Sequence, residues 1–180
     1  MSDETTTQPN EPPVKAAAPP VKAEAPPPEP GEFGKKLESK GIPVEHLGKD
    51  AHGTEAVRVE GADLIRASEF LRDDCGFDLA TCCTSVDWKT HRESVYHLYG
   101  TDNHTFLAVK VKADASEHSP SLTPVWPALN WHEREAYDLM GIHYDGHPKL
   151  ERILMPSDWL GHPLRKDYKV TDPRLVWNER

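Results

Sequence analysis

The chain has 180 residues, of which 37% are hydrophobic and 28% charged, and its formal net charge is -9. This length suits one domain of ordinary size, and the acidic balance argues against a nucleic-acid-binding protein, which would carry a basic stripe. The apolar runs are far shorter than a membrane span and the first residues lack the features of a secretory signal, so we expect a cytoplasmic protein unless a partner holds it at a membrane.

The first segment, residues 1–32, holds nine of the seventeen prolines and no aromatic residue. A segment so poor in large apolar side chains cannot bury enough surface to fold. We therefore predict a disordered, partly extended Pro/Ala-rich tail whose simplest role is to solubilise or tether the rest of the chain.

Residues 33–120 are predicted to form a small α+β domain. Alternating apolar and charged residues indicate half-buried strands, and a period of 3.6 residues indicates a helix. The predicted elements are a short helix at 33–41, a strand at 54–60, a helix at 62–75 and strands at 77–88, 94–99 and 105–113. After the opening helix the order is β-α-β-β-β, with a mostly antiparallel sheet and a hairpin between the last two strands.

Residues 121–180 are predicted to form two short helices and then a long extended C-terminal tail. Ser121 can cap a helix over 122–127, and Asn130 a second helix that Gly141 ends. The remaining residues show no sustained period, yet they are too apolar for a solvated tail. We expect a partner protein to cover them, so a chain that ends at Gly141 should fold but fail to assemble.

Two groups of histidines invite a metal-site interpretation. Residues 132–136 begin the H-E-x-x-H pattern of metalloproteases, but alanine stands where the second histidine is needed, which excludes that site. His143 and His147 are four residues apart, with His162 further on, but the glycine and proline around them favour a loop. We interpret these histidines as structural.

The three cysteines, at 75, 82 and 83, are too few for an iron–sulfur cluster. Neighbouring residues on a strand point to opposite faces, so Cys82 and Cys83 are poorly placed to share a metal, and we interpret the thiols as buried structural groups. The glycine-rich phosphate-binding patterns are also missing. The sequence predicts no cofactor in this chain.

Charged residues are dense among the aromatic residues after position 130. Arg134 and Asp138 are i, i+4 neighbours and are expected to pair on a helix. The other charges are expected to form ion pairs between subunits, because arginine suits bidentate pairing with a partner's carboxylate.

The run from 132 to 168 reads HEREAYDLMGIHYDGHPKLERILMPSDWLGHPLRKDY. It resembles the signature of the complex I family of C subunits, called the 30 kDa subunit in mitochondria. The shared elements, in order, are E-R-E-x-x-D-L, G-I, G-H-P-x-L-x-R-I-L and D-W-x-G-H-P-L-R-K-D-Y. One departure is Glu151, where the family usually carries a basic residue or proline.

The resemblance implies a structural subunit of the proton-pumping NADH–quinone oxidoreductase, a translocase, with no catalytic centre and no cofactor of its own. FMN and iron–sulfur clusters would lie in other subunits. The chain would sit in the hydrophilic arm, peripheral on the cytoplasmic side of the inner (plasma) membrane and attached only through the complex. Its chief partner would be the D subunit, which is similar to a hydrogenase large chain, with iron–sulfur subunits nearby. The residues expected at the partner interface are Glu133, Arg134, Asp138, His147, Arg152, Asp158, Trp159, His162, Arg165, Lys166 and Tyr168.

Two alternatives stay open. The chain could be the equivalent subunit of a membrane-bound hydrogenase or of another quinone-linked dehydrogenase, with a similar partner and a different electron donor. It could instead be a freestanding metal-dependent enzyme, which predicts bound metal in the isolated protein and loss of function when His143 or His147 is changed.

Overall fold

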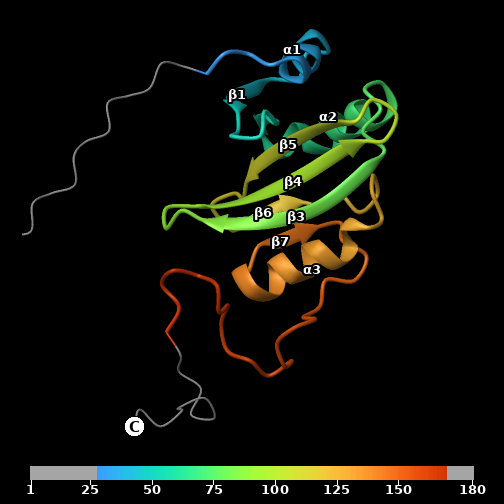
Figure 1. Cartoon of the computed structure of the whole chain (residues 1–180). Helices are drawn as coiled ribbons and strands as arrows, with labels where there is room; N and C mark the ends of the chain where they lie inside the picture. Colours follow the sequence, from blue (N-terminus) through green and yellow to red (C-terminus); the bar gives the residue numbers. More distant parts are fainter. Residues whose placement is uncertain (1–27, 170–180) are drawn as a thin grey trace, which may run out of the picture.

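The computed structural model describes residues 28–169, which contain three helices and seven strands (Figure 1). The helices are α1 (Glu32–Ser39), α2 (Gly61–Asp73) and α3 (Leu129–Met140). The strands are β1 (Val44–Lys49), β2 (Glu55–Val59), β3 (Leu79–Asp87), β4 (Arg92–Gly100), β5 (Thr105–Lys112), β6 (His118–Pro120) and β7 (His143–Asp145). Most of the predicted proline-rich tail lies outside the described residues.

The main sheet has five strands in the order β1-β2-β5-β4-β3. Only the pair β2–β5 is parallel, because α2 separates β2 from the strands that follow, and the other neighbours are antiparallel. The predicted α+β class and the predicted hairpin, now β4–β5, are confirmed. The short strands β6 and β7 form a separate parallel pair.

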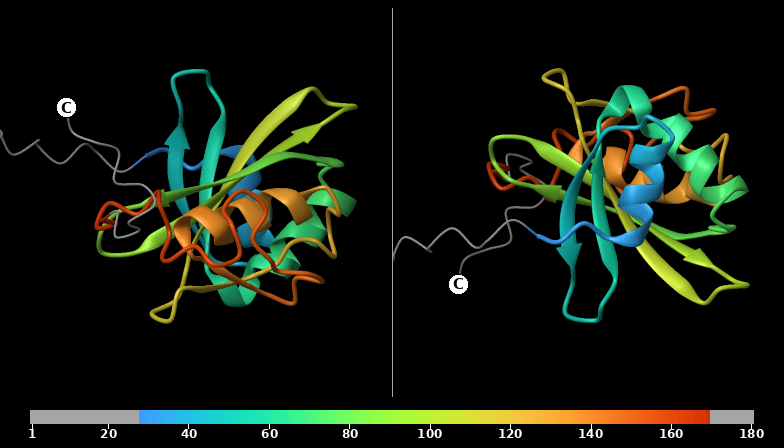
Figure 2. Two further views of the ribbon diagram at one scale, coloured as in Figure 1. Left: turned by 90° about the horizontal axis from the view of Figure 1, so that it is seen from below. Right: turned by 90° about the horizontal axis from the view of Figure 1, so that it is seen from above.

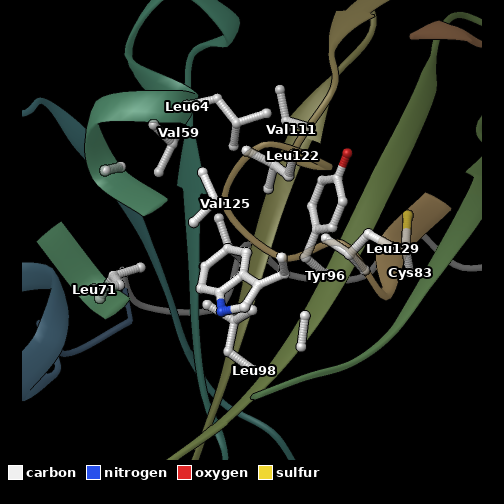
Figure 3. Close-up of a cluster of buried hydrophobic side chains, with 14 of the residues drawn as sticks. Val59, Leu64, Leu71, Cys83, Tyr96, Leu98, Val111, Leu122, Val125 and Leu129 are labelled. Carbon is white, nitrogen blue, oxygen red and sulfur yellow. The ribbon is translucent and has the colours of Figure 1, made fainter. Parts of the chain in front are cut away.

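All three helices bury side chains in one core, together with the residues of one face of the main sheet. Figure 2 shows α3 across the sheet in the view from below, and α1 beside β1 and β2 in the view from above. Leu37 of α1, Leu64 of α2 and Leu129 of α3 belong to the same cluster. Val95 and Ala108, which point to the other face of the sheet, lie outside it although they are buried. Figure 3 shows the centre of this core, where α2, the sheet and the loop before α3 meet around Tyr96.

One strand was missed, and one predicted helix is wrong. Strand β1 was not expected, because its alternation is short and a bulge at Gly48, whose φ is +78°, interrupts its pairing with β2. Residues 122–127 form turns and not a helix. The amide of Trp126 does donate to Leu122 O at 2.9 Å, but Pro127 follows and disfavours the helical conformation at the residue before it.

Helix α3 begins at Leu129, with Ala128 as its N-cap and no capping side chain, so Asn130 does not cap it. It ends as predicted, with Gly141 in the left-handed conformation at φ +75°.

The chain after Gly141 is partly core. Ile142 and Tyr144 are fully buried, and the Tyr144 hydroxyl lies 2.7 Å from Ser94 Oγ of β4. The expectation that a partner must cover these two side chains is therefore wrong. The irregular segment begins only at Gly146, and residues 146–168 are called the strap below.

Candidate interaction surface

Helix α3 carries two carboxylates that are completely buried, Glu133 and Asp138. They lie five residues apart, roughly 140° round the helix axis, and therefore face different surroundings. Glu133 points into the core beneath the loop before the helix, whereas Asp138 lies under the strap. Neither has exposed surface in the described chain, and both make their contacts within it.

Glu133 closes the loop before α3 onto the helix. Its carboxylate accepts hydrogen bonds from the Ser121 hydroxyl at 2.6 Å, the Leu122 amide at 2.8 Å and the Tyr96 hydroxyl at 3.4 Å. Burial raises the pKa of Glu133 to about 7, and these three hydrogen bonds only partly oppose that rise. The side chain therefore holds the loop in place and titrates near neutral pH.

This raised pKa predicts a pH-dependent stability. Between the ordinary pKa of a glutamate and about 7 the unfolded chain is ionised while the folded chain keeps its proton, so the free energy of unfolding falls as the pH rises. The slope is at most about 1.4 kcal/mol per pH unit. Glu133→Gln cannot ionise and should remove this slope, which urea unfolding at pH 5, 6, 7 and 8 measures. A constant difference between the two proteins over this range would contradict the assignment.

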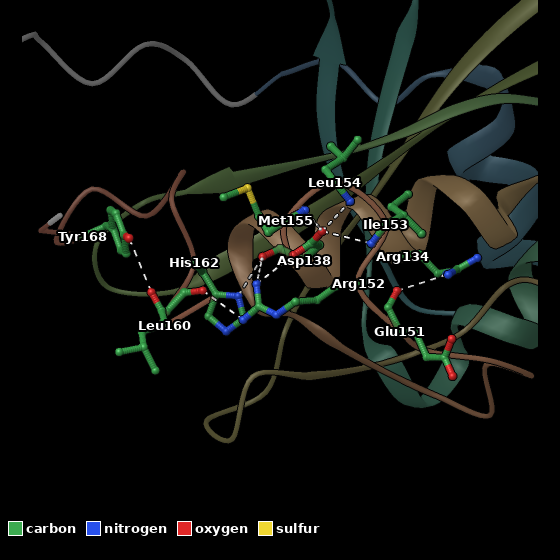
Figure 4. Close-up of polar contacts among 11 residues, drawn as sticks. Arg134, Asp138, Glu151, Arg152, Ile153, Leu154, Met155, Leu160, His162 and Tyr168 are labelled. Carbon is green, nitrogen blue, oxygen red and sulfur yellow. Dashed lines mark hydrogen bonds and ion pairs between the residues drawn. The ribbon is translucent and has the colours of Figure 1, made fainter. Parts of the chain in front are cut away.

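Asp138 is the main anchor of the strap (Figure 4). Its Oδ2 accepts three consecutive strap amides, those of Ile153 at 3.0 Å, Leu154 at 2.8 Å and Met155 at 2.9 Å. Its Oδ1 accepts Arg152 Nη1 at 2.7 Å. Burial alone would raise the pKa of Asp138, but the backbone amides and Arg152 outweigh it and lower the pKa. The carboxylate thus stays ionised and fixes the strap's backbone.

The strap also satisfies the free carbonyl groups at the end of α3. The last four carbonyls of a helix have no partner within it. Here Asp138 O accepts His162 Nδ1 at 3.0 Å and Arg152 Nη1 at 3.2 Å, and Leu139 O accepts the amide of Leu164 at 3.0 Å. Met140 O accepts Arg165 Nε at 2.7 Å, and Arg165 Nη2 reaches Gly141 O at 3.4 Å. Two guanidinium groups therefore lie at the negative end of the helix dipole.

The far end of the strap is held by two carboxylates outside α3. Asp87, at the end of β3, accepts the Lys166 amide at 2.8 Å, and this hydrogen bond is the first cause of its lowered pKa. Glu117, before β6, pairs with both Arg165 and Arg92. The sequence analysis missed both acids, because each lies far along the chain from the strap and no local spacing connects them.

The two histidines of the Gly-His-Pro turns serve as neutral hydrogen-bond donors. His147 Nε2 lies 3.1 Å from Asn130 O, and His162 Nδ1 lies 3.0 Å from Asp138 O. A carbonyl oxygen can only accept, so each ring nitrogen carries a proton. Burial lowers the pKa of both rings, which keeps them uncharged at neutral pH. Both histidines hold the strap on α3, in agreement with the structural interpretation.

The expected pair between Arg134 and Asp138 does not form. Arg134 lies over the Trp131 ring, 5.0 Å from its centroid, and its Nε donates to Glu151 O at 3.1 Å. Asp138 pairs with Arg152 instead. Arg134 and Asp138 do have the i, i+4 spacing of a helical pair. Asp138 is buried under the strap, however, and therefore pairs with Arg152 of the strap.

The remaining predicted interface residues all lie in the strap. Asp158 and Lys166 are exposed, and Tyr168 donates to Leu160 O at 3.4 Å. Trp159 is half-buried, and its Nε1 is shielded and has no hydrogen-bond acceptor within the described chain. Of the predicted residues in the strap, His147, Arg152, His162 and Arg165 form hydrogen bonds to α3.

Apolar side chains stand exposed around these anchors. Three leucines of the strap, Leu154, Leu160 and Leu164, are 58%, 66% and 55% exposed, and Trp131 of α3 is 64% exposed. A shallow pocket of about 220 Å³ lies between α3 and β3, and Leu164 lines its edge. A rigid backbone that displays apolar side chains is typical of a protein-binding surface. We call the strap together with Trp131 the strap surface.

Comparison with known proteins finds that the chain is similar to members of one family. Residues 57–174, which include α3 and the whole strap, match the family described as "Respiratory-chain NADH dehydrogenase, 30 Kd subunit". The NADH-quinone oxidoreductase C subunit of Geobacter metallireducens is 41% identical over 130 residues, which cover 69% of this chain and 80% of that protein. The C subunit of Roseiflexus sp. is 45% identical over 133 residues, 70% of this chain and 76% of that protein. The C subunit of Methylorubrum populi is 43% identical over 67% of this chain, which spans only 58% of that longer relative.

Solved structures share the fold. A trypsin-resistant fragment of Nqo5 superimposes with a TM-score of 0.55 at 24% identity, over 64% of this chain and 95% of the fragment. A chain of the membrane-bound sulfane sulfur reductase, an archaeal respiratory membrane complex, superimposes with a TM-score of 0.61 at 27% identity. That match covers 76% of this chain and 84% of the other.

Proposed function

Because the chain belongs to the 30 kDa subunit family of the respiratory-chain NADH dehydrogenase, we propose that it is a structural subunit of NADH–quinone oxidoreductase whose strap surface docks on the D subunit. Its relatives are named as subunits of NADH-quinone oxidoreductase, which supports membership in this complex.

One observation carries the docking proposal: the strap is rigidly anchored, yet it displays apolar side chains outward. Asp138 and the arginines fix its backbone on α3, whereas Leu154, Leu160 and Leu164 stand largely exposed. A preorganised apolar surface loses little conformational freedom on binding, which favours a stable contact between subunits.

We also propose that the chain holds no redox cofactor, so that electrons pass through FMN and iron–sulfur clusters of neighbouring subunits. Cys83 is buried, and its burial raises the pKa of the thiol, which opposes formation of the thiolate that a metal cluster needs. Cys75 lies in the turn after α2, and burial raises the pKa of its thiol as well. No catalytic role is assigned to either.

No helix among residues 28–169 is long and apolar enough to cross a membrane. We propose that the chain reaches the cytoplasmic face of the inner membrane through its partners in the complex.

A pull-down of the tagged chain from solubilised membranes, with mass spectrometry of the recovered proteins, tests the proposal. We expect the D subunit, iron–sulfur subunits and an NADH-binding flavoprotein to be recovered together. Recovery of the chain alone would contradict membership in a complex.

Two carboxylates placed on the strap surface should lower the amount of the D subunit that the pull-down recovers. Leu160→Asp with Leu164→Asp puts carboxylates where we expect an apolar contact, and loss of central contacts in an interface commonly costs about 2 kcal/mol or more. We expect at least a tenfold lower yield of the D subunit in the same pull-down. Ile65→Asp, at an exposed apolar position on α2, is the matched control and should leave the yield unchanged. Equal yields from both variants would show that the strap surface is not the contact.

A second function is favoured by the likeness to the sulfane sulfur reductase chain. The chain would then occupy the same position in a related respiratory machine, such as a membrane-bound hydrogenase or another quinone-linked dehydrogenase. In the pull-down this alternative predicts a protein similar to the D subunit together with a different electron-input module in place of the NADH-binding flavoprotein.

A further inference from the structure

The small parallel pair β6–β7 places three metal-ligating side chains together on the surface. The register pairs His118 with His143, and Asp145 follows His143 by two residues on the same strand. Side chains two residues apart on a strand share a face, so all three lie on the outer side of the pair. The residue between them, Tyr144, points the opposite way into the core.

The donor atoms of this cluster converge on one point. His118 Nδ1 lies 2.8 Å and His143 Nδ1 lies 3.2 Å from the same Asp145 Oδ1. The two imidazole rings are stacked, with 4.4 Å between their centroids. The ligand atoms of the three residues all lie within 4.8 Å of one another.

We propose that His118, His143 and Asp145 form a binding site for a divalent transition-metal ion of the Zn²⁺ type. Two imidazole nitrogens and one carboxylate oxygen are a donor set that zinc accepts, with water in the remaining position. In a tetrahedral site with bonds of about 2.1 Å, neighbouring ligand atoms lie about 3.4 Å apart. The distances of 2.8 and 3.2 Å to Asp145 Oδ1 need to lengthen by about 0.6 Å or less. The ligand nitrogens of His118 and His143 lie within 4.8 Å of each other, and small rotations of the two side chains bring them to the same spacing.

The backbone beneath the site is already fixed. The His118 amide donates to Asp114 Oδ1 at 2.9 Å, and the His143 amide donates to Glu117 O at 2.8 Å. On the other side, Asp145 O accepts the amide of Ser121 at 2.9 Å. The strands therefore hold the three side chains at a set spacing before any ion binds, which limits the conformational freedom lost on binding.

The ion would join the two strands just where the strap leaves the core. The ring of Tyr137, on α3, lies 6.3 Å from the rings of both His143 and His162. Bound metal would thus stiffen the start of the strap, and we assign it a structural role. The site uses His143 with His118 and not with His147, whose ring contacts Asn130 instead.

Titration of the full-length chain with Zn²⁺, followed by calorimetry, tests the site. We expect saturable binding of one Zn²⁺ per chain and a higher melting temperature in its presence. Co²⁺ in the same site should give the visible absorption of a low-symmetry, four-coordinate ion. His118→Asn, His143→Asn and Asp145→Asn should each weaken binding at least tenfold and remove the thermal shift.

The control is His52→Asn, an exposed histidine in the turn between β1 and β2, which should bind Zn²⁺ as the wild type does. If binding is absent up to about 1 mM Zn²⁺, or persists unchanged in the His118 and His143 variants, the three residues are only a hydrogen-bonded cluster and the proposal is wrong. The measurement uses the isolated chain, so its outcome is independent of the proposed role in the complex.

Discussion

Asp138→Ala is expected to release the strap and to lower the free energy of unfolding by about 3 kcal/mol. The substitution leaves three strap amides and Arg152 without their shared acceptor, and the carboxylate that is lost is fully buried. Urea unfolding measures the loss of stability, and amide hydrogen exchange over residues 146–168 measures release of the strap. Because the pKa of Asp138 is lowered in the folded chain, its contribution is present above the ordinary aspartate pKa and should shrink as the pH falls below about 4.

The matched control is Asp73→Ala. Asp73 also lies in the last turn of a helix and also pairs with an arginine, but that pair, with Arg72, lies on the surface. Exposed pairs contribute roughly 0–1 kcal/mol, so the control should stay close to the wild type. If Asp138→Ala behaves like the control and the strap keeps its protection, Asp138 is not the anchor.

Shortening the chain at two different points should separate folding from assembly. A chain that ends at Gly141 loses Ile142 and Tyr144, two fully buried side chains, and each such loss costs about 2–5 kcal/mol. Since a domain is stable by only about 5–15 kcal/mol, this shorter chain should unfold or melt far below the wild type. A chain that ends at Gly146 keeps both residues and β7, and should fold while losing its partner. Circular dichroism melting measures the first effect and the pull-down measures the second.

This result would revise the expectation from the sequence, in which the cut at Gly141 left a folded domain. If the chain ending at Gly141 melts like the chain ending at Gly146, the residues of β7 do not belong to the core. If the chain ending at Gly146 still recovers the D subunit at full yield, the strap is not the docking segment.

Much of the fold could be predicted, because apolar periodicity reports which side chains are buried. Strands β2 to β5 and helix α2 follow clear periods and were predicted within a few residues of their bounds. Strand β1 was missed because Gly48 and its bulge break the alternation. Strand β7 was missed because it has only three residues, two of them outward-facing His143 and Asp145, so its period is too short to detect.

The sequence indicated which segment forms the candidate site, but it did not indicate which of its side chains contact one another. Among the charges between 132 and 168, Asp138, Arg152 and Arg165 do meet at the C-terminal end of α3. Which charge pairs with which depends on burial, and so Asp138 meets Arg152 rather than its helical neighbour Arg134. The metal-site geometry was missed for a similar reason: His118 and His143 are far apart in sequence, and only the pairing of β6 with β7 brings them together.

Photo-crosslinking from the strap tests docking on the D subunit most directly. A photoreactive amino acid in place of Leu160 would be activated in the assembled complex, with the same substitution at Ile65 as the control position. We predict a cross-link from position 160 to the D subunit and none from position 65. Cross-links from position 160 only to other subunits, or equal cross-linking to the D subunit from both positions, would contradict docking of the strap on that partner.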